Sequence, residues 1–429
     1  MSVRLFGHDT PRLWIGRIDL ALHFCGDAPR SALMSVSSDA LIDFKRESLR
    51  GAPGYFRVGL TQVGQWWMVD PADRPFFARA VHGVAATPEA VHDPAARLRQ
   101  WGFNTLGCGS ERLYQEEGMA FLRAVGFAGT GPVINLAGVR LPDVFDADWP
   151  RAVDERARAV CEPLAENRHL LGWVTDDVPG WPTQPAVDRP GLLQVCLSLE
   201  PGLAVYHAAW EFVLALHGSK LPVLAKAWGV TLTNKEALRD LTRREQGLVT
   251  RGYLRDEERW SQEFAQRYFT TTVAAIRRHA PHHLVLGCRW GGPVSATLRS
   301  ACAAVADICL IDHTELPGVP TMPVLLGDFN WSTKAFWEEG TARRLLGPTT
   351  LERMLRRGRL GLARAVAHPA VVGYAWSRWH DRAGEQAPFG SGLVHANENE
   401  AREHTELLTA INDRVEELRA MTLYVEDMI

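Results

Sequence analysis

From about residue 55 onward, short apolar runs alternate with longer amphipathic stretches. Repeated strand–helix units give this alternation and build a parallel sheet. The runs are nearly continuous, as expected of strands buried on both faces. Eight runs predict strands: Phe76–Val81, Thr105–Cys108, Val133–Leu136, Leu171–Val174, Leu284–Arg289, Ile308–Ile311, Val324–Phe329 and Val371–Trp376. Eight such units predict an α/β fold, the (β/α)8 TIM barrel.

The stretches between these runs predict the helices. They are Pro88–Gln100, Gly118–Val125, Trp149–Glu166, Trp260–His279, Val294–Val305, Thr350–Ala367 and Glu400–Thr422. Two parts lie outside the repeat. Residues 1–54 predict a short β-rich N-terminal lead-in before a barrel at 55–429, and residues 182–258 predict a long insertion after the fourth strand. The insertion contains a predicted helix, Leu203–His217. Loops after barrel strands lie on the catalytic face and shape substrate pockets.

Composition and charge exclude several classes of protein. Apolar residues make up 46% and charged residues 23%, as in folded globular proteins. A net charge of −3 gives no reason to expect nucleic acid or an anionic membrane as partner. The first twenty residues carry charges where a secretory signal needs an apolar run, and the seven cysteines are scattered without a C-x-x-C pair. We therefore expect a cytoplasmic protein without membrane span, metal or cofactor.

Several segments resemble a known enzyme family in order and spacing. The first is YFRVGLTQVGQWWMVDPADRPFFARAVHGV, and it is followed by WGFNTLG, ENRHLLGWVTDDVPGW, EFVLALHGSKLPVLAKAWGVTLTNKEAL, HHLVLGCRW, PVLLGDF and VVGYAWSRWHDRAGEQAPFGSGLVHANENE. Together they resemble the agarase and β-galactosidase-like glycoside hydrolases of the large retaining barrel clan. That resemblance covers roughly residues 55–429 and implies catalytic residues after strands four and seven.

Both catalytic positions of the family differ in this sequence. The family has glutamates, one in an Asn-Glu pair after strand four and one in a Gly-Glu-Phe that ends strand seven. Here the corresponding residues are Asp176-Asp177 and Gly327-Asp328-Phe329. The resemblance therefore implies that Asp177 is the general acid and Asp328 the nucleophile or general base. Asp176 takes the place of the Asn that holds a sugar hydroxyl.

The shorter side chains leave three outcomes open. Retaining glycosidases hold their carboxyl groups about 5–5.5 Å apart and inverting ones about 6.5–9.5 Å apart. Removing a methylene from each retracts each carboxyl by roughly 1–1.5 Å. The chain is then an inverting hydrolase, a retaining one whose backbone lies closer, or a barrel that has lost hydrolysis. The third outcome includes a protein that only binds sugar and one that performs a different reaction on a sugar-containing metabolite.

Polar residues at other strand ends are candidate substrate-binding residues. Arg289 closes the fifth predicted strand, where it contacts substrate, keeps a catalytic carboxylate ionised, or pairs with Asp328 or Asp312 as part of the scaffold. Arg79 lies inside an apolar run, and barrel interiors seldom keep such a group unless it points to the mouth. Asp312 and His313 follow the sixth strand, and His313 is either a base or a hydrogen-bonded surface residue.

Tryptophan is abundant, with fifteen residues, many of them at strand ends. Indole faces stack on the C–H faces of sugars, but tryptophan also fills cores. The resemblance implies that Trp376 is an aromatic platform beneath the sugar, with packing in the core as the alternative. Trp173 and Trp331 are further candidates for sugar subsites.

Two hypotheses from different classes follow. The first is an intracellular glycoside hydrolase or transglycosidase that acts on a small glycoside or oligosaccharide through Asp177 and Asp328. Convergence of these residues with Asp176 and Asp312 would favour a cationic ligand such as an amino sugar. The second is a non-hydrolytic carbohydrate-binding barrel. The expected partner is a small carbohydrate, and a homo-oligomer remains open.

Overall fold

The computed structural model describes residues 44–85, 93–113, 118–182, 184–291, 294–312, 316, 321–331, 348–381 and 390–426. All of them belong to one unit, Leu41–Ile429. Most of the predicted lead-in therefore lies outside the described residues. Its last residues contain the 3-10 helix η2 (Arg46–Ser48) and bridge to the first hairpin through Phe44 with Thr61 and Arg50 with Val58.

Eight parallel strands form the central sheet, in the spatial order β10-β9-β6-β5-β4-β13-β12-β11. In chain order they are β4 (Ala78–Val81), β5 (Thr105–Leu106), β6 (Ala120–Ala124), β9 (Leu170–Val174), β10 (Leu284–Val285), β11 (Cys309–Ile311), β12 (Val324–Phe329) and β13 (Val371–Trp376). The fifth and sixth strands, at the two ends of this order, are joined by hydrogen bonds from Leu310 N to Leu286 O and from Ile308 N to Val285 O, both 3.3 Å. The eight-stranded sheet is therefore a TIM-like barrel.

One predicted helix is wrong, and one predicted strand forms but lies outside the barrel. The third barrel strand is β6, within the stretch Gly118–Val125 that was predicted to be helical. The predicted strand Val133–Leu136 is β7, but it pairs only with β8 (Val139–Pro142) in an antiparallel hairpin outside the barrel. Ala137 and Gly138 form the two-residue turn with φ of 49° and 79°, the positive values that a type I′ turn requires.

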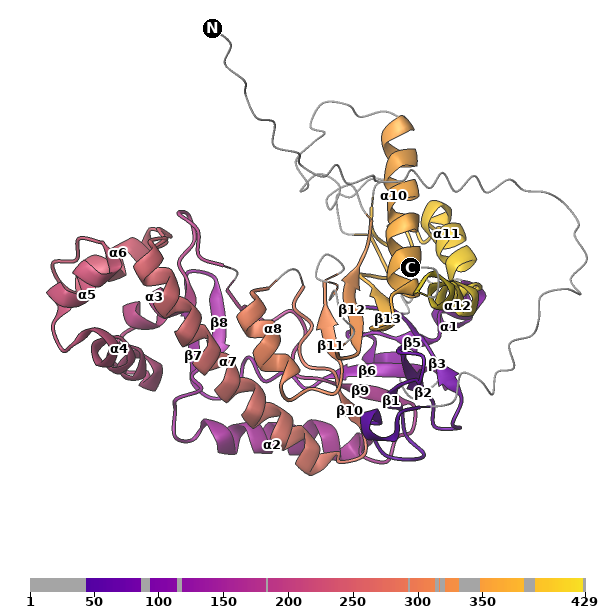
Figure 1. Ribbon diagram of the computed structural model, residues 1–429, viewed down its shortest axis with the longest axis horizontal. Helices are drawn as coiled ribbons and strands as arrows, with labels where there is room; N and C mark the ends of the chain where they lie inside the picture. The colour runs from indigo at the N-terminus through magenta and orange to yellow at the C-terminus, as the bar shows by residue number, and fades with distance from the viewer. Residues whose placement is uncertain are drawn as a thin grey trace, which may run out of the picture. The chain divides into compact units, whose positions relative to one another are not determined.

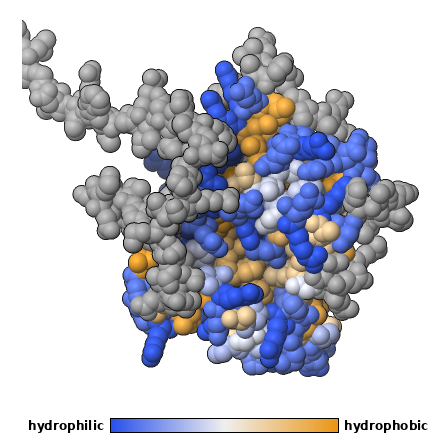
Figure 2. All heavy atoms as spheres, turned by 90° about the vertical axis from the view of Figure 1, so that its right-hand side faces the viewer, coloured by the Kyte–Doolittle hydropathy of each residue, from blue (hydrophilic) through white to orange (hydrophobic). Residues whose placement is uncertain are grey.

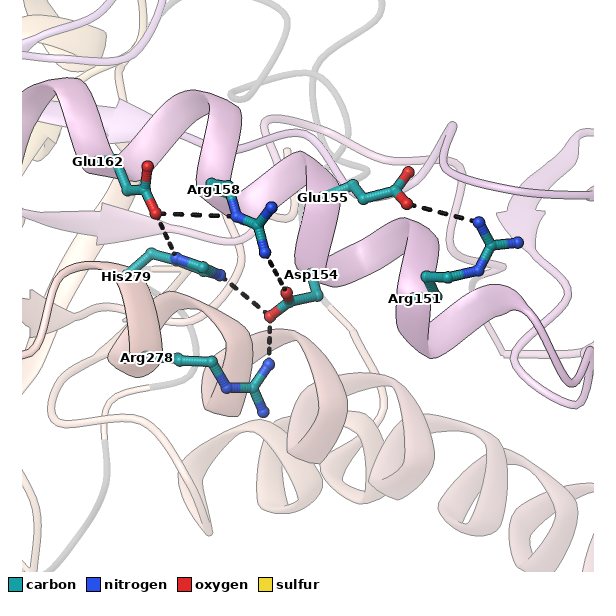
Figure 3. Close-up of polar contacts among 7 residues, drawn as sticks. All are labelled: Arg151, Asp154, Glu155, Arg158, Glu162, Arg278 and His279. Carbon is teal, nitrogen blue, oxygen red and sulfur yellow. Dashed lines mark hydrogen bonds and ion pairs between the residues drawn. The ribbon is translucent and has the colours of Figure 1, made fainter.

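Helices cover the sheet. They include α1 (Pro94–Gln100), α2 (Trp149–Cys161), α7 (Arg251–His279), α8 (Ala296–Ala303), α10 (Pro348–Ala367), α11 (Arg402–Asn412) and α12 (Val415–Glu426). Helices α2 and α7 lie side by side (Figure 1). Figure 3 shows the ion pairs at this contact, in which Asp154 of α2 accepts from Arg278 and His279 of α7 and also from Arg158 of its own helix. On the face seen in Figure 2, hydrophilic side chains dominate the coloured surface, as expected for the solvent side of such helices.

The predicted insertion contributes a group of helices that pack against α7. These are α3 (Leu192–Ser198), α4 (Ala204–His217), α5 (Leu221–Trp228) and α6 (Lys235–Arg243). The buried Glu257 of α7 accepts hydrogen bonds from Leu192 N (2.8 Å) and Leu193 N (2.9 Å). These two amides belong to the first turn of α3, where amides have no partner inside the helix, so Glu257 caps α3.

A small antiparallel sheet adjoins the N-terminal end of β13. It consists of β1 (Arg57–Leu60), β2 (Trp66–Val69) and β3 (Pro75–Phe76). Trp66 N donates to Pro369 O (2.8 Å), two residues before β13 begins. Arg419 of α12 is fully buried and donates to the carbonyl oxygens of Trp66 (2.6 Å), Val371 (2.6 Å) and Val366 (3.1 Å). One side chain therefore joins α12, α10, this sheet and the barrel.

Candidate functional site

Two carboxylates and one guanidinium meet at the C-terminal ends of the fourth, fifth and seventh strands. Arg289 Nη1 donates to Asp177 Oδ1 at 2.5 Å, and Arg289 Nη2 donates to Asp328 Oδ1 at 3.2 Å. The side chains of Asp177, Asp328 and Arg289 are 33%, 23% and 11% exposed. The structure thus brings together both predicted catalytic residues and one predicted substrate-binding residue, with the arginine bridging the acids.

Further hydrogen bonds fix the position of Arg289. Its Nε donates to Gly327 O (3.3 Å) and its Nη2 to Ser377 O (3.5 Å), so the side chain contacts the seventh and eighth strand ends. Its main chain continues the pairing of β9 with β10, because Arg289 N donates to Asp176 O (3.0 Å) and Val178 N donates to Arg289 O (2.8 Å). The side chain is therefore held by the ends of the fourth, seventh and eighth strands, and the main chain by the fourth.

Burial and charge act in opposite directions on these groups. Burial raises the pKa of Asp328, and the neighbouring Arg289 offsets only part of that increase. Burial lowers the pKa of Arg289, but Asp328 and Asp177 outweigh it and leave the pKa above its ordinary value. Arg289 therefore keeps its positive charge between the acids at physiological pH.

The bridging geometry also limits the gap between the acids. Because both accept hydrogen bonds from the two ends of one planar guanidinium, the bonded oxygens lie roughly 8 Å apart or less. That is within the range used by glycosidases of either stereochemistry. The space between the two oxygens is, however, occupied by the guanidinium of Arg289.

Two buried residues beside the cluster were not predicted from the sequence. His82 follows β4, and its Nε2 lies 2.9 Å from Gly327 O, the carbonyl that also accepts from Arg289. Burial, with Arg289 second, holds the pKa of His82 well below its ordinary value. Cys108 follows β5, and burial followed by the charge of Asp177 raises its thiol pKa to about 12. Both side chains are therefore neutral. The sequence signal that could have indicated them is their position just after a short apolar run, which ends at Val81 before His82 and at Leu106 before Cys108.

Asp312 lies near the cluster. It lines a small hollow with Asp328 and the half-buried Trp290, together with Gly291, Leu310, Ile311 and Gly327. The hollow has a volume of about 10 Å³, enough for about one water molecule. His313 lies outside the described residues.

Asp176 does not point into the cluster. Its side chain is buried, Oδ1 accepts from Ala128 N (2.7 Å), and Oδ2 accepts from the hydroxyl of Tyr268 on α7. Both carboxyl oxygens are therefore bonded to the protein.

The structure does not bring Arg79 into the cluster either. Arg79 Nη1 donates to Asn412 O at 2.7 Å, at the end of α11. Burial lowers the pKa of Arg79, while the nearby Tyr374, Glu416 and Asp413 act in the opposite direction. Arg79 therefore faces the helical layer.

The predicted tryptophans are buried. Trp376 Nε1 donates to Ser391 O (2.8 Å), and the ring packs edge-to-face on Trp331 with centroids 4.8 Å apart. Trp331 Nε1 donates to His404 Nδ1 (3.0 Å). Trp173 is fully buried against His283. All three indoles pack within the protein, so we do not place them in the site proposed below.

A larger hollow lies away from the strand ends. Its volume is about 590 Å³, and Arg151, Asp154, Arg158 and Arg278 of α2 and α7 are among its lining residues (Figure 3). These charged side chains pair with carboxylates or with one another, so we do not consider it the site. Within the described ranges, no group of three or more His, Cys, Asp or Glu side chains is arranged to hold a metal, and no helix is both long and apolar enough to cross a membrane.

The fold and the cluster define a TIM-like barrel of eight parallel strands with paired acids at the C-terminal ends of its fourth and seventh strands. No protein-family model matches the sequence. An alignment over 238 residues, which covers 49% of this chain, gives 26% identity to β-agarase A of Vibrio sp. (strain JT0107). The matched part is 23% of that relative, so the chain corresponds to less than a quarter of its length.

Solved structures share the fold over most of the chain. PfGH50B superimposes with a TM-score of 0.63 at 15% identity, covering 87% of this chain and 67% of that one. An exo-β-agarase gives 0.61 at 16% identity, with coverages of 87% and 67%. A β-galactosidase from Bacillus circulans sp. alkalophilus gives 0.51 at 11% identity, with coverages of 81% and 57%. The chain thus has an agarase- and β-galactosidase-like barrel fold.

Proposed function

We propose that this barrel binds a carbohydrate over Asp177, Arg289 and Asp328 and does not hydrolyse it while Arg289 holds its observed position. The observation that carries the proposal is that one guanidinium donates to both acids. The cluster offers a charged donor and two acceptors on one surface, a combination that suits sugar hydroxyls. The similarity to agarase and β-galactosidase structures supports a galactose-containing ligand.

The geometry argues against hydrolysis by this pair of acids. A general acid must reach the leaving-group oxygen, whereas Oδ1 of Asp177 accepts a hydrogen bond from Arg289 Nη1. The guanidinium also lies where the scissile bond should be, between the acids. Hydrolysis is the second candidate function, and the short separation of the acids favours it. It requires Arg289 to leave when substrate enters.

The amino-sugar version of the proposal loses its basis. It depended on four acids gathered at one site, each raising the pKa of the others. Instead, Asp176 is bonded to the scaffold, and Asp177 and Asp328 share a cation. We therefore propose a neutral sugar.

The test combines binding and turnover in the same samples. Calorimetry with agaro-oligosaccharides and lactose measures binding, and product analysis after long incubation measures hydrolysis. We expect binding without product, and weakening by about tenfold or more in Asp328→Asn, because a charged hydrogen bond contributes about 1.5–3 kcal/mol. Asp148→Asn, an exposed acid on a distant helix start, is the matched control.

Two outcomes would overturn this conclusion. Product formation that is lost in both Asp177→Asn and Asp328→Asn would establish the hydrolase. Absence of binding to every galactose-containing oligosaccharide tested would remove the carbohydrate proposal altogether.

A further inference from the structure

Asp176 connects the strand-four end to two other parts of the barrel. Its side chain is 2% exposed, yet it is a carboxyl group. Its two oxygens bond Ala128 in the segment after β6 and Tyr268 on α7. A buried carboxyl is unfavourable unless its oxygens have hydrogen-bond partners. Because both oxygens of Asp176 have such partners, its side chain is held in one position.

The main chain of Asp176 leads directly to the cluster. Its carbonyl oxygen accepts from Arg289 N (3.0 Å), and the next residue is Asp177. Val178 then has a φ of 51°, a left-handed conformation that β-branched residues rarely adopt. Such a backbone persists only where its surroundings hold it. The side chain of Asp176 bonds this turn to Ala128 and Tyr268, and that of Asp177 bonds it to Arg289.

A proton on Asp176 would change these contacts. The carboxylate accepts from both partners, whereas a protonated carboxyl carries a hydrogen on one oxygen. It must then reverse the hydrogen bond with Tyr268 and donate to its hydroxyl oxygen, or lose a bond that it accepts. Burial raises the pKa of Asp176 to about 7, against the hydrogen bonds from Tyr268, Ala128 and Phe127 and the charge of Arg156 on α2. Burial also raises the pKa of Tyr268 well above its ordinary value, so its hydroxyl remains a donor.

The remaining titratable group against Asp176 is a thiol. Cys288 Sγ lies 3.7 Å from Asp176 O, and burial raises its pKa well above the ordinary value. Neither Tyr268 nor Cys288 therefore changes charge near neutrality. Of Asp176, Tyr268 and Cys288, Asp176 is therefore the group that gains or loses a proton near neutral pH.

We propose that Asp176 is a positioning residue whose carboxyl, held by Tyr268 and Ala128, sets the position of Asp177 and Arg289 and resets it when the carboxyl takes up a proton. The barrel thereby acquires a pH-dependent ligand site. The pH dependence of ligand binding rests on the proposed function, whereas the proton uptake by Asp176 does not depend on a ligand.

The first experiment needs no sugar. Infrared difference spectra against Asp176→Asn follow the protonated carboxyl band through a pH titration. We expect one carboxyl that titrates near neutrality. Tyr268→Phe should move the midpoint upward, because the hydroxyl stabilises the carboxylate. A carboxyl that titrates at the ordinary pH of an aspartic acid would overturn the inference, whatever the sugar results are.

The second experiment measures affinity for an agaro-oligosaccharide at pH 6, 7 and 8. We expect a several-fold change for the wild type, a constant affinity for Asp176→Asn, and an inflection at higher pH for Tyr268→Phe. A scaffold residue alone would change the affinity by the same factor at each pH. Parallel profiles of wild type and Asp176→Asn would therefore contradict the proposal. Absence of any binding would instead count against the proposed function, and the infrared titration would still decide the proton uptake.

Discussion

Arg289 determines what the two acids beside it can do. An arginine beside one acid keeps that acid ionised, as a nucleophile must be. Here the same guanidinium bonds Asp177 and Asp328, and two backbone carbonyls hold it in place. One residue therefore balances the charge of both acids, and in the proposed function it also contacts the ligand.

Replacing Arg289 by Met tests that role. We expect Arg289→Met to lower the free energy of unfolding by about 2 kcal/mol at neutral pH, because half-buried carboxylates lose their partner. Without the guanidinium, the pKa of Asp328 rises further above its already raised value. A raised carboxyl pKa destabilises the folded state above that pKa, and the effect disappears as the pH falls through it. Urea unfolding at neutral and acid pH should thus show a loss that shrinks toward acid.

The double variant Arg289→Met/Asp328→Asn is the control for that experiment. It should recover part of the lost stability at neutral pH, since no charge is left without its partner at position 328. Equal losses at both pH values would mean that Arg289 stabilises the site through packing alone.

The candidate site was only partly predictable from sequence. An acid that ends a buried apolar run, such as Asp328, can be recognised because it needs a partner or a cleft. Asp176 and Asp177 both follow the end of β9, where strand alternation does not apply. The sequence therefore does not show that Asp177 enters the site while Asp176 bonds to Ala128 and Tyr268. The sequence likewise does not show that Arg79 faces α11, or that neighbouring residues cover the indole of Trp376.

At the scale of elements, most strands and helices follow from periodicity, and the exceptions have a physical reason. The run Ala120–Ala124 is a short apolar segment without β-branched residues, which periodicity alone cannot separate from a buried helix. Val133–Leu136 is rich in strand formers and is a strand. Its turn, Ala137-Gly138, lacks the Asn-Gly or Asp-Gly signal that usually marks a hairpin, and so its pairing was not predictable.

The contact of α3 with α7 depends on Glu257. Besides capping α3, this carboxyl accepts from Tyr253 Oη (2.6 Å) and Ser261 Oγ (3.1 Å). Glu257→Ala should destabilise this contact by about 2 kcal/mol, because it leaves buried donors without a partner. Hydrogen exchange of the α3 amides should then accelerate.

The neighbouring Glu258 provides the matched control for this prediction. It is exposed on the same helix, and Glu258→Ala should leave α3 exchange unchanged. Equal exchange in the two variants would mean that apolar packing alone holds α3.

At the scale of the whole molecule, Arg419 connects parts that are far apart in the chain. Its guanidinium lies 4.3 Å from the ring centroid of Trp67, in addition to its three carbonyl contacts. We expect Arg419→Met to lower the global free energy of unfolding by about 3 kcal/mol, because three buried carbonyls lose a charged donor. Urea denaturation monitored by tryptophan fluorescence measures this loss.

The comparison for Arg419 is Arg414, an exposed residue that pairs with Glu417. Arg414→Met should change the stability by less than about 0.5 kcal/mol. If Arg419→Met were equally mild, the tie between α12 and the barrel would have to come from apolar contacts.

The barrel closes between β10 and β11, a junction called the seam below. Val285 O accepts from Ile308 N (3.3 Å) and Asp307 N (2.8 Å), Leu286 O accepts from Leu310 N (3.3 Å), and Val285 N donates to Asp307 Oδ2 (2.9 Å). Arg289 lies on one side of the seam, and the indole of Trp290 bridges to the other by donating to Leu310 O. Any breathing of the barrel along this seam would therefore widen or narrow the ligand-facing rim directly, without hinge motion elsewhere.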